Sequence, residues 1–408
     1  MGVSHSSEPF TAPRSDEPTA SAGHSLSVGP SVSAPSVEPS TRAKRTRKRR
    51  IISIGVVLTV VALFIVGLIP VDKVIESPGP TFNVLGSTDE GGKEVPVIQV
   101  DGAPTYPTTG ELRMTTVGVR GCPGYPVRVI DWVIASLSSS QKVIDRDLVC
   151  PKTMTREEVD SISTAQMTSS QDAAVVAALL YTGVATSMKL TVAGLAPEQD
   201  AALQKGDVLA SIKTPGEETA TPIETYAQLR ELLTTIPPHT TVTLTVMRDG
   251  QPIDVSLTTV EPPEGVDGSL LGVYLTPSAN SDVSAHFGLE DVGGPSAGMM
   301  FTLGLIDQLT QEDLTGGQKI AGTGTIDASG NIGPIGGIQQ KMIGAKGSGV
   351  NYFLAPTSNC DEVVGHVPDG MQAFAVATLD DAVTTVKGIA AQSTDSLMTC
   401  EQVQEQAQ

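Results

Sequence analysis

The sequence predicts an α+β protein of several domains with a single transmembrane helix near its N-terminus. Three observations lead to this fold class. The chain has 408 residues, which is enough for two or three domains. One long stretch carries no charged residue. Elsewhere, strand-like runs with an apolar residue at every second position mix with helix-like runs in which apolar residues recur every three or four positions.

The composition indicates apolar cores inside an acidic protein. Hydrophobic residues make up 39% of the chain and aromatic residues only 3%, so the cores are expected to consist mainly of Val, Leu, Ile and Ala. The formal net charge is −19. This charge argues against nucleic acid as a partner, because phosphate backbones attract basic proteins.

Residues 1–50 are predicted to form a disordered cytoplasmic tail that ends in a basic cluster. The first forty residues are rich in Ser, Pro, Thr, Ala and Gly and contain few large apolar side chains. Such a segment cannot bury enough apolar surface to offset its loss of chain entropy. The cluster itself is "TRAKRTRKRR" over residues 41–50.

Residues 51–70 are predicted to be the transmembrane helix. The run "IISIGVVLTVVALFIVGLI" carries no charge and approaches the about 20 residues that span a bilayer. A cleaved signal peptide fits less well, because a long segment precedes the run and no small-residue cleavage site follows it. A buried core helix is the remaining alternative. The basic cluster favours a plasma-membrane protein with a cytoplasmic N-terminus, an extracytoplasmic catalytic domain and the lipid bilayer as one partner.

Four cysteines lie on the side predicted to be extracytoplasmic: Cys122, Cys150, Cys360 and Cys400. An even number of cysteines in an oxidising compartment predicts two disulfides. Three pairings are possible, and proximity along the chain favours Cys122 with Cys150 and Cys360 with Cys400. There is no Cys-x-x-Cys pair and there are only five histidines, so no metal site is predicted.

Residues 182–260 are predicted to be a compact module between two longer segments, residues 71–181 and 261–390. It contains a turn into a strand, "LQKGDVLASI", then a helix, "ETYAQLRELLTTI", then a hairpin whose strands alternate around Asp249 and Gly250. This order resembles a bacterial PDZ domain, although "YTGVATSMKLTV" has no clear Gly-Leu-Gly-Phe loop. An ordinary small α+β module is the alternative. The resemblance implies capture of an extended peptide beside a strand at about residues 189–193.

Residues 261–390 follow an α/β pattern, and residues 391–408 are expected to form a C-terminal tail. In "GGPSAG", Ser296 stands at the start of an apolar helical pattern. A serine hydroxyl is a weak nucleophile until a base removes its proton. His286 lies ten residues upstream, but no acid is marked that would orient it.

A lysine can replace histidine as the base if it is neutral, as in known Ser–Lys dyads. Burial among apolar groups disfavours the ammonium form and lowers its pKa. Lys341 is the candidate, because it lies on an expected helix that begins after Pro334 and has apolar neighbours. Lys346 stands beside glycines and is expected to be exposed.

Three motifs resemble the proteolytic domain of Lon-type peptidases: Gly294-Pro295-Ser296-Ala297-Gly298, Thr323-Gly324-Thr325-Ile326, and Pro-Ile-Gly-Gly-x-x-x-Lys ending at Lys341. The resemblance implies that Ser296 is the nucleophile, that Lys341 is the general base and that Thr323 binds the lysine amine. Backbone groups at Gly294, Pro295 and Ala297 are expected to stabilise the oxyanion at the start of the helix.

Two positions depart from the Lon pattern. Lon enzymes often carry an acid three residues before the serine, where this chain has Gly293, with Asp291 two further back. They often carry Glu just before the lysine, where this chain has Gln340. The chain also contains no Gly-x-x-x-x-Gly-Lys-Ser/Thr motif, so neither ATP nor another cofactor is expected.

Taken together, residues 70–389 resemble the membrane-anchored, PDZ-containing Lon-like serine peptidases of Gram-positive bacteria. The resemblance implies an ATP-independent serine endopeptidase whose discontinuous protease domain is interrupted by the PDZ domain. Its substrates would be extracytoplasmic peptides, or unfolded segments of secreted and membrane proteins, captured by that domain. One alternative is a non-catalytic PDZ adaptor on a degenerate protease scaffold, and another is an enzyme served by a separate ATP-driven unfoldase. The oligomeric state does not follow from the sequence.

Overall fold

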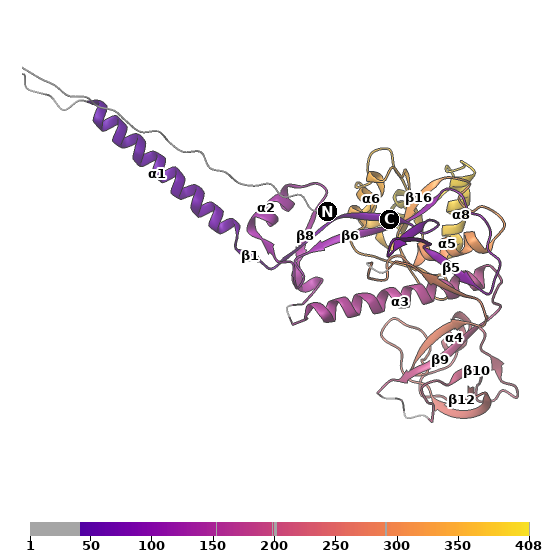
Figure 1. Cartoon of the computed structure of the whole chain (residues 1–408). Helices are drawn as coiled ribbons and strands as arrows, with labels where there is room; N and C mark the ends of the chain where they lie inside the picture. The colour runs from indigo at the N-terminus through magenta and orange to yellow at the C-terminus, as the bar shows by residue number, and fades with distance from the viewer. Residues whose placement is uncertain (1–40, 152, 198, 200–201, 290–291, 408) are drawn as a thin grey trace, which may run out of the picture. The chain divides into compact units, whose positions relative to one another are not determined.

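The structure is a computed structural model that describes residues 41–151, 153–197, 199, 202–289 and 292–407 (Figure 1). It divides into two units, Met1–Leu63 and Phe64–Gln408. The predicted disordered tail, apart from its basic cluster, lies outside the described residues, and so does Asp291.

The prediction of a transmembrane helix at residues 51–70 is wrong. Helix α1 (Thr41–Gly67) begins in the basic segment and ends before the apolar run does. Its apolar part is therefore shorter than the about 20 residues that a bilayer requires. Across the described ranges, no helix has the length and apolar character needed to span a membrane. The predicted plasma-membrane location and the extracytoplasmic catalytic domain are corrected with it.

The observed fold is a mixed α/β fold built around a six-stranded sheet. The sheet contains, in spatial order, β20 (Gln372–Val376), β19 (Tyr352–Pro356), β16 (Lys319–Gly322), β6 (Glu111–Arg120), β2 (Lys73–Asn83) and β8 (Lys142–Asp145). The first four strands are parallel, and β2 and β8 are antiparallel to their neighbours. Since β6 precedes residues 182–260 and β16 follows them, segments from both sides of this module form one sheet.

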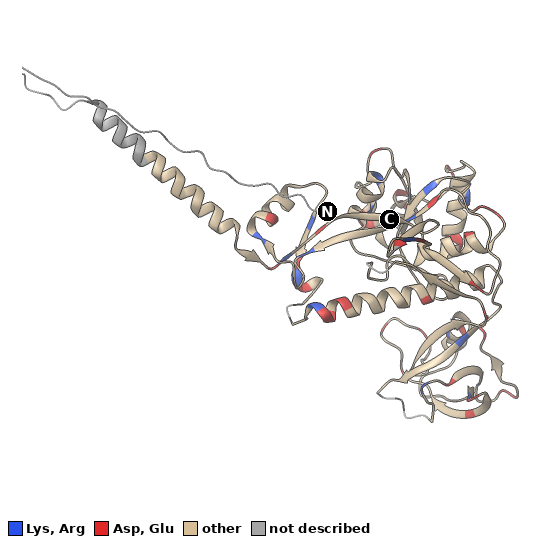
Figure 2. Cartoon of the chain, viewed as in Figure 1, with Lys and Arg blue, Asp and Glu red and all other residues tan. Residues whose placement is uncertain are grey.

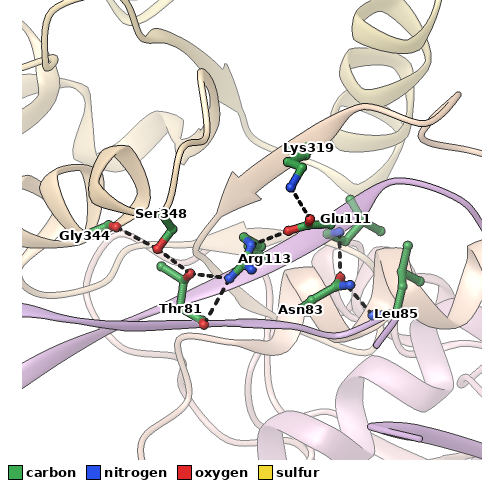
Figure 3. Close-up of polar contacts among 9 residues, drawn as sticks. Thr81, Asn83, Leu85, Glu111, Arg113, Lys319, Gly344 and Ser348 are labelled. Carbon is green, nitrogen blue, oxygen red and sulfur yellow. Dashed lines mark hydrogen bonds and ion pairs between the residues drawn. The ribbon is translucent and has the colours of Figure 1, made fainter. Parts of the chain in front are cut away.

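A chain of polar contacts ties these two segments together (Figure 3). Lys319 Nζ lies 2.5 Å from Glu111 Oε1, and Arg113 Nε lies 2.5 Å from the other oxygen of the same carboxylate. Arg113 Nη1 donates to Thr81 Oγ1 at 2.8 Å, and Thr81 Oγ1 donates to Ser348 Oγ at 2.9 Å. The contacts join β2 and β6 to β16 and to the end of α6 (Ile338–Gly347).

Helices α3 (Arg156–Tyr181) and α5 (Gly298–Leu309) share the main apolar core with the sheet. α3 is a long helix that begins with a capping box formed by Thr155 and Glu158, and its first turn is acidic (Figures 1 and 2). The remaining helices are short: α2 (Val129–Leu137), α7 (Cys360–Val363), α8 (Leu379–Ala390) and α9 (Cys400–Ala407), with the 3-10 turns η1 (Arg146–Leu148) and η2 (Thr357–Asn359).

The module at residues 182–260 contributes most of a second, antiparallel sheet. Its order is β13 (Gln251–Thr258), β12 (Thr241–Arg248), β10 (Val208–Lys213), β9 (Met188–Leu195) and β14 (Val273–Ala279), with β11 (Thr221–Pro222) beside β10 and α4 (Tyr226–Thr234) as the helix. The predicted hairpin is confirmed: Asp249 and Gly250 have φ of 51° and 76°, and left-handed conformations at both central residues suit a tight turn.

The predicted peptide capture beside β9 is wrong for this structure, because both edges of β9 are already paired. One edge bonds to β10. The other bonds to β14 in antiparallel register, from Leu195 opposite Val273 to Met188 opposite Ala279. The strand edge that the PDZ resemblance assigns to a substrate is thus filled by a later segment of the same chain.

Short ladders and two disulfides complete the described structure. The ladders pair β1 (Pro70–Val71) with β7 (Val127–Arg128), β3 (Ser87–Glu90) with β4 (Lys93–Pro96), β5 (Ile98–Asp101) with β15 (Ser284–Phe287), and β17 (Thr325–Ile326) with β18 (Ile332–Gly333). One disulfide joins Cys122 to Cys150, and the other joins Cys360 on α7 to Cys400 on α9.

Candidate active site

Ser296 lies in the turn between β15 and α5, two residues before the first residue of α5. It is half-buried. Its carbonyl oxygen accepts hydrogen bonds from the backbone N–H of Gly324 at 2.9 Å and from Thr323 Oγ1 at 3.0 Å. The backbone of the serine is therefore held against the segment that follows β16, while its side chain remains accessible.

The small residues around Ser296 are explained by the close approach of α3 and β17. Ser170 on α3 donates a hydrogen bond to the carbonyl of Pro295 at 2.9 Å. A Cβ atom at Gly298 would lie 2.7 Å from Ser170 Oγ and 3.0 Å from Ile326 Cγ2. Position 298 consequently has no room for a side chain unless one of these neighbours moves.

Lys341 on α6 points at the serine from the protein interior. Only 3% of the residue is exposed. Its Nζ lies 2.8 Å from Ser296 Oγ and 2.9 Å from Thr323 Oγ1. In the part of the chain that the structure describes, Lys341 has no ion-pair partner. Burial lowers the pKa of Lys341 to about 8. The carboxylate of Glu76 acts in the opposite direction and offsets only part of this lowering.

Thr323, which is fully buried, orients the lysine. Because its O–H donates a hydrogen bond to the Ser296 carbonyl, its lone pairs face Lys341 and accept a hydrogen bond from Nζ–H. A neutral amine bound in this way can direct its own lone pair toward Ser296 Oγ. The structure brings together the three side chains singled out in the sequence.

The three backbone positions expected to bind an oxyanion differ in whether they have an N–H group available to donate. The N–H of Gly294 donates to the carbonyl of Ser163 at 3.0 Å. Pro295 has no N–H to donate. Within the described residues, no hydrogen bond engages the N–H of Ala297, which precedes α5. Of the three, Ala297 is the position that can donate to a negative charge near Ser296.

Ser296 and Lys341 open into a cleft of about 710 Å³. This volume falls within the range of small-molecule and peptide sites. Most of the lining is apolar, contributed by Phe82, Met114, Val117, Met167, Val292 and Ile335 among others. The cleft can hold a short stretch of extended peptide against the hydroxyl of Ser296.

Glu76 is a cleft residue that the sequence analysis did not identify. It lies on β2, opposite Val119 of β6 and Lys142 of β8. Burial raises the pKa of Glu76, an effect that Lys142 opposes and Glu362 reinforces. The strand pattern around it contained one weak signal, an acidic residue directly after the apolar pair Val74 and Ile75.

Three other polar residues lie outside this constellation. His286 is exposed, lies 4.0 Å from Asp101 and does not line the cleft. Lys346 donates to Asn351 Oδ1 at 2.8 Å and to the carbonyl of Gly370 at 3.0 Å. Gln340 is buried, and its Oε1 has no hydrogen-bond partner among the described residues.

Comparison with known proteins relates the segment that carries Ser296 and Lys341 to a known protein family. Residues 278–388 match the Lon protease (S16) C-terminal proteolytic domain. The Lon protease of Lachnoclostridium phytofermentans is 31% identical over 108 residues, which are 25% of this chain and 13% of that protein. The Lon protease of Treponema pallidum is 33% identical over 94 residues, 22% of this chain and 10% of the relative.

A eukaryotic relative gives the same result. The mitochondrial Lon protease homolog of Drosophila melanogaster is 34% identical over 91 residues, 22% of this chain and 9% of that protein. The chain thus spans only about a tenth of the length of these relatives. Within that span, the prediction of a Lon-type proteolytic domain, the domain of a serine-type peptidase, is confirmed.

Proposed function

We propose that the chain is a serine endopeptidase in which Ser296 is the nucleophile and Lys341 the general base. The observation that carries this proposal is the 2.8 Å contact between Ser296 Oγ and the Nζ of a buried lysine. A pKa of about 8 leaves a substantial fraction of Lys341 neutral near pH 7.5, and only the neutral amine can accept a proton.

In the proposed reaction, Ser296 Oγ bonds to the carbonyl carbon of the scissile peptide while its proton passes to Lys341 Nζ. The carbonyl oxygen becomes negatively charged and is stabilised by the N–H of Ala297 and the start of α5. The lysine ammonium then donates its proton to the departing amine, which leaves an ester on Ser296. Water then attacks the ester carbonyl and gives a proton to the same lysine. The bond to Ser296 Oγ breaks, the lysine returns that proton to Oγ, and the second product leaves with a new carboxyl group.

We further propose that residues 71–181 and 261–390 form one discontinuous protease domain with a PDZ-like module, residues 182–260, inserted between them. The shared sheet and the polar contacts of Figure 3 support the discontinuous domain. The module's core includes Val176 of α3 and Ala328, which lies between β17 and β18. A role in supporting the protease domain accounts for this packing better than strand addition at β9.

Cleavage by this chain is proposed to need no ATP, because its sequence contains no phosphate-binding Gly-x-x-x-x-Gly-Lys-Ser/Thr motif. Suitable substrates are then peptides or segments that are already extended. A non-catalytic adaptor would not need the contacts among Ser296, Lys341 and Thr323, so these contacts favour the peptidase.

The test is peptide hydrolysis by Ser296→Ala, Lys341→Met and the double variant. Each single variant is expected to lose at least about 10³-fold in kcat, and the double variant is expected to be no worse, because the two groups act as a unit. Lys346→Met is the matched control, since that lysine lies on the same helix but not at the serine, and it should retain activity. Near-wild-type turnover by Lys341→Met would refute the dyad.

A further inference from the structure

Among the described residues that line the cleft, Lys341 and Glu76 carry the charged side chains. Lys341 contacts the nucleophile, so Glu76 is the charged group that the reaction leaves unused. It lies half-buried on β2, on the strand face opposite that of its buried neighbour Ile75.

The Glu76 carboxylate forms neither a hydrogen bond nor an ion pair with any described residue. Its cross-strand neighbour Lys142 instead donates to Glu362 at 3.0 Å. The charged groups that face Glu76 are therefore Lys142, Glu362 and Lys341. Lys142 and Glu362 balance each other, and Lys341 is neutral when it acts as a base. Among the described residues of the cleft, no cation then directly contacts the Glu76 carboxylate.

The carboxylate of Glu76 lies close to Gly337, the residue that precedes α6. Gly337 has φ of 68°, and a Cβ atom there would lie 3.4 Å from Glu76 Oε2 and 2.8 Å from Val117 Cγ2. Glu76 thus lies against the N-terminal end of α6, about one helical turn from Lys341. The wall beside it is apolar, formed in part by Val117 and Val119.

We propose that Glu76 is a specificity-determining residue that binds a lysine or arginine side chain of the peptide substrate. The inference rests on the proposed peptidase function and adds the substrate class. The apolar wall suits the methylene stem of such a side chain, and the carboxylate binds its cationic end. The net charge of −19 also attracts cationic peptides to the protein as a whole, and Figure 2 shows acidic residues on many of the described elements.

The experiment uses pairs of peptides that differ only by arginine or citrulline at one position, scanned along both sides of the scissile bond. Citrulline keeps the shape of arginine and removes its charge. The wild-type chain is expected to prefer arginine at one position by on the order of tenfold in kcat/KM. Glu76→Gln should remove this preference, and Glu76→Lys should replace it with a preference for glutamate over glutamine there.

Glu264→Gln is the matched control, because it removes the same charge at an exposed position that does not line the cleft. It should keep the arginine preference. An unchanged preference in Glu76→Gln would overturn the proposal. A shifted pH–rate profile in Glu76→Gln with an unchanged arginine preference would also overturn the proposal. Glu76 would then act only on Lys341 or on the end of α6.

A binding measurement separates this inference from the proposed reaction. The Ser296→Ala protein keeps Glu76 and the cleft, so titration calorimetry with the same peptides should show tighter binding of the arginine member. That result would sustain the role of Glu76 even if no Ser296-dependent hydrolysis were found. Ser296-dependent hydrolysis without any charge preference would instead sustain the peptidase and overturn only the role of Glu76.

Discussion

Two buried ionisable residues, one in the protease part and one in the inserted module, have opposite surroundings. Asp207 of the module is 1% exposed and receives two hydrogen bonds of 2.7 Å from Arg248. Arg248 keeps the pKa of Asp207 below its usual range. Lys341 is buried to the same degree but contacts only two neutral hydroxyls, and burial lowers its pKa to about 8.

The difference shows that the partner, rather than burial alone, decides what a buried ionisable group does. A carboxylate paired with a guanidinium stays ionised and holds the fold together. An ammonium placed against hydroxyls loses its proton near neutral pH and becomes a base. The predictions that follow test this contrast, from the largest expected effect to the smallest.

The largest effect concerns the protonation of Lys341. Below a pKa of about 8 the lysine is an ammonium and cannot accept the proton of Ser296, so kcat/KM should fall about tenfold for each pH unit. About fiftyfold is expected between pH 8 and pH 6, because half of the lysine is neutral at its pKa, and the rate reaches a plateau above the pKa. The measurement is a pH–rate profile with a peptide that has no ionisable group. A flat profile from pH 6 to 9 would show that Lys341 is not the base.

Next comes the removal of Asp207, which should destabilise the module. Asp207→Ala leaves the guanidinium of Arg248 half-buried without its partner, and a loss of about 2–4 kcal/mol in the free energy of unfolding is expected. Urea denaturation measures this value. Glu218→Ala removes an exposed acid of the same module and should change it by less than about 0.5 kcal/mol. A similarly small loss in Asp207→Ala would mean that the buried pair does not stabilise the module.

Thr323→Val tests how far orientation of the lysine matters. The substitution preserves shape but removes both the hydrogen bond from Lys341 and the one to the Ser296 carbonyl. We expect kcat to fall by on the order of tenfold, with little change in KM. Thr385→Val, at another buried threonine on α8, is the control and should keep wild-type kcat. An equal kcat in both variants would remove Thr323 from the site.

The smallest effect concerns a buried acid of the protease part, Asp307 on α5. It is 1% exposed, and burial raises its pKa to about 6 although Oδ1 accepts the N–H of Leu314 at 2.6 Å. Because the folded pKa lies above the ordinary value of 3.8, the stability present at low pH is lost as the pH rises through 6. Asp307→Asn should therefore stabilise the protein at pH 8 and hardly at pH 4.

Asp313 is the matched comparison for this measurement. Burial would raise its pKa, but hydrogen bonds from Thr109 and Thr315 outweigh burial and lower it. Asp313→Asn is expected to lose stability at pH 8, opposite in sign to Asp307→Asn. Thermal unfolding at pH 4 and pH 8 distinguishes the two variants, and equal signs would show that the balance between burial and hydrogen bonds does not decide the effect.

Parts of this molecule could be predicted because they depend on short-range patterns. The β12–β13 hairpin follows from alternating residues and from the turn at Asp249 and Gly250. The grouping of Ser296, Thr323 and Lys341 was implied by the resemblance of three motifs to the Lon proteolytic domain. The position of Glu76 could not be predicted in this way, since it depends on β2 lying beside α6.

The predictions that proved wrong also concern features that a local stretch of sequence does not fix. The prediction of a span at residues 51–70 depended on an uncharged run and its basic flank, whereas no described helix has the length and apolar character to span a membrane. The resemblance to a PDZ domain implied an open edge at β9, and the structure pairs that edge with β14. Likewise, Gly294 cannot serve an oxyanion through its N–H, because that group bonds to Ser163 on α3.

The sequence by itself determined the strand and helix patterns, the hairpin turn and the identities of the serine, lysine and threonine in the site. These features depend on periodicity, turn chemistry and residue type, which a local stretch of chain already contains. Only the tertiary structure decided that Lys341 is buried without a carboxylate partner, that β14 fills the edge of β9 and that Glu76 faces the cleft. The physical reason is that desolvation, strand pairing and charge balance arise between segments far apart in the chain, and they exist only once those segments are packed together.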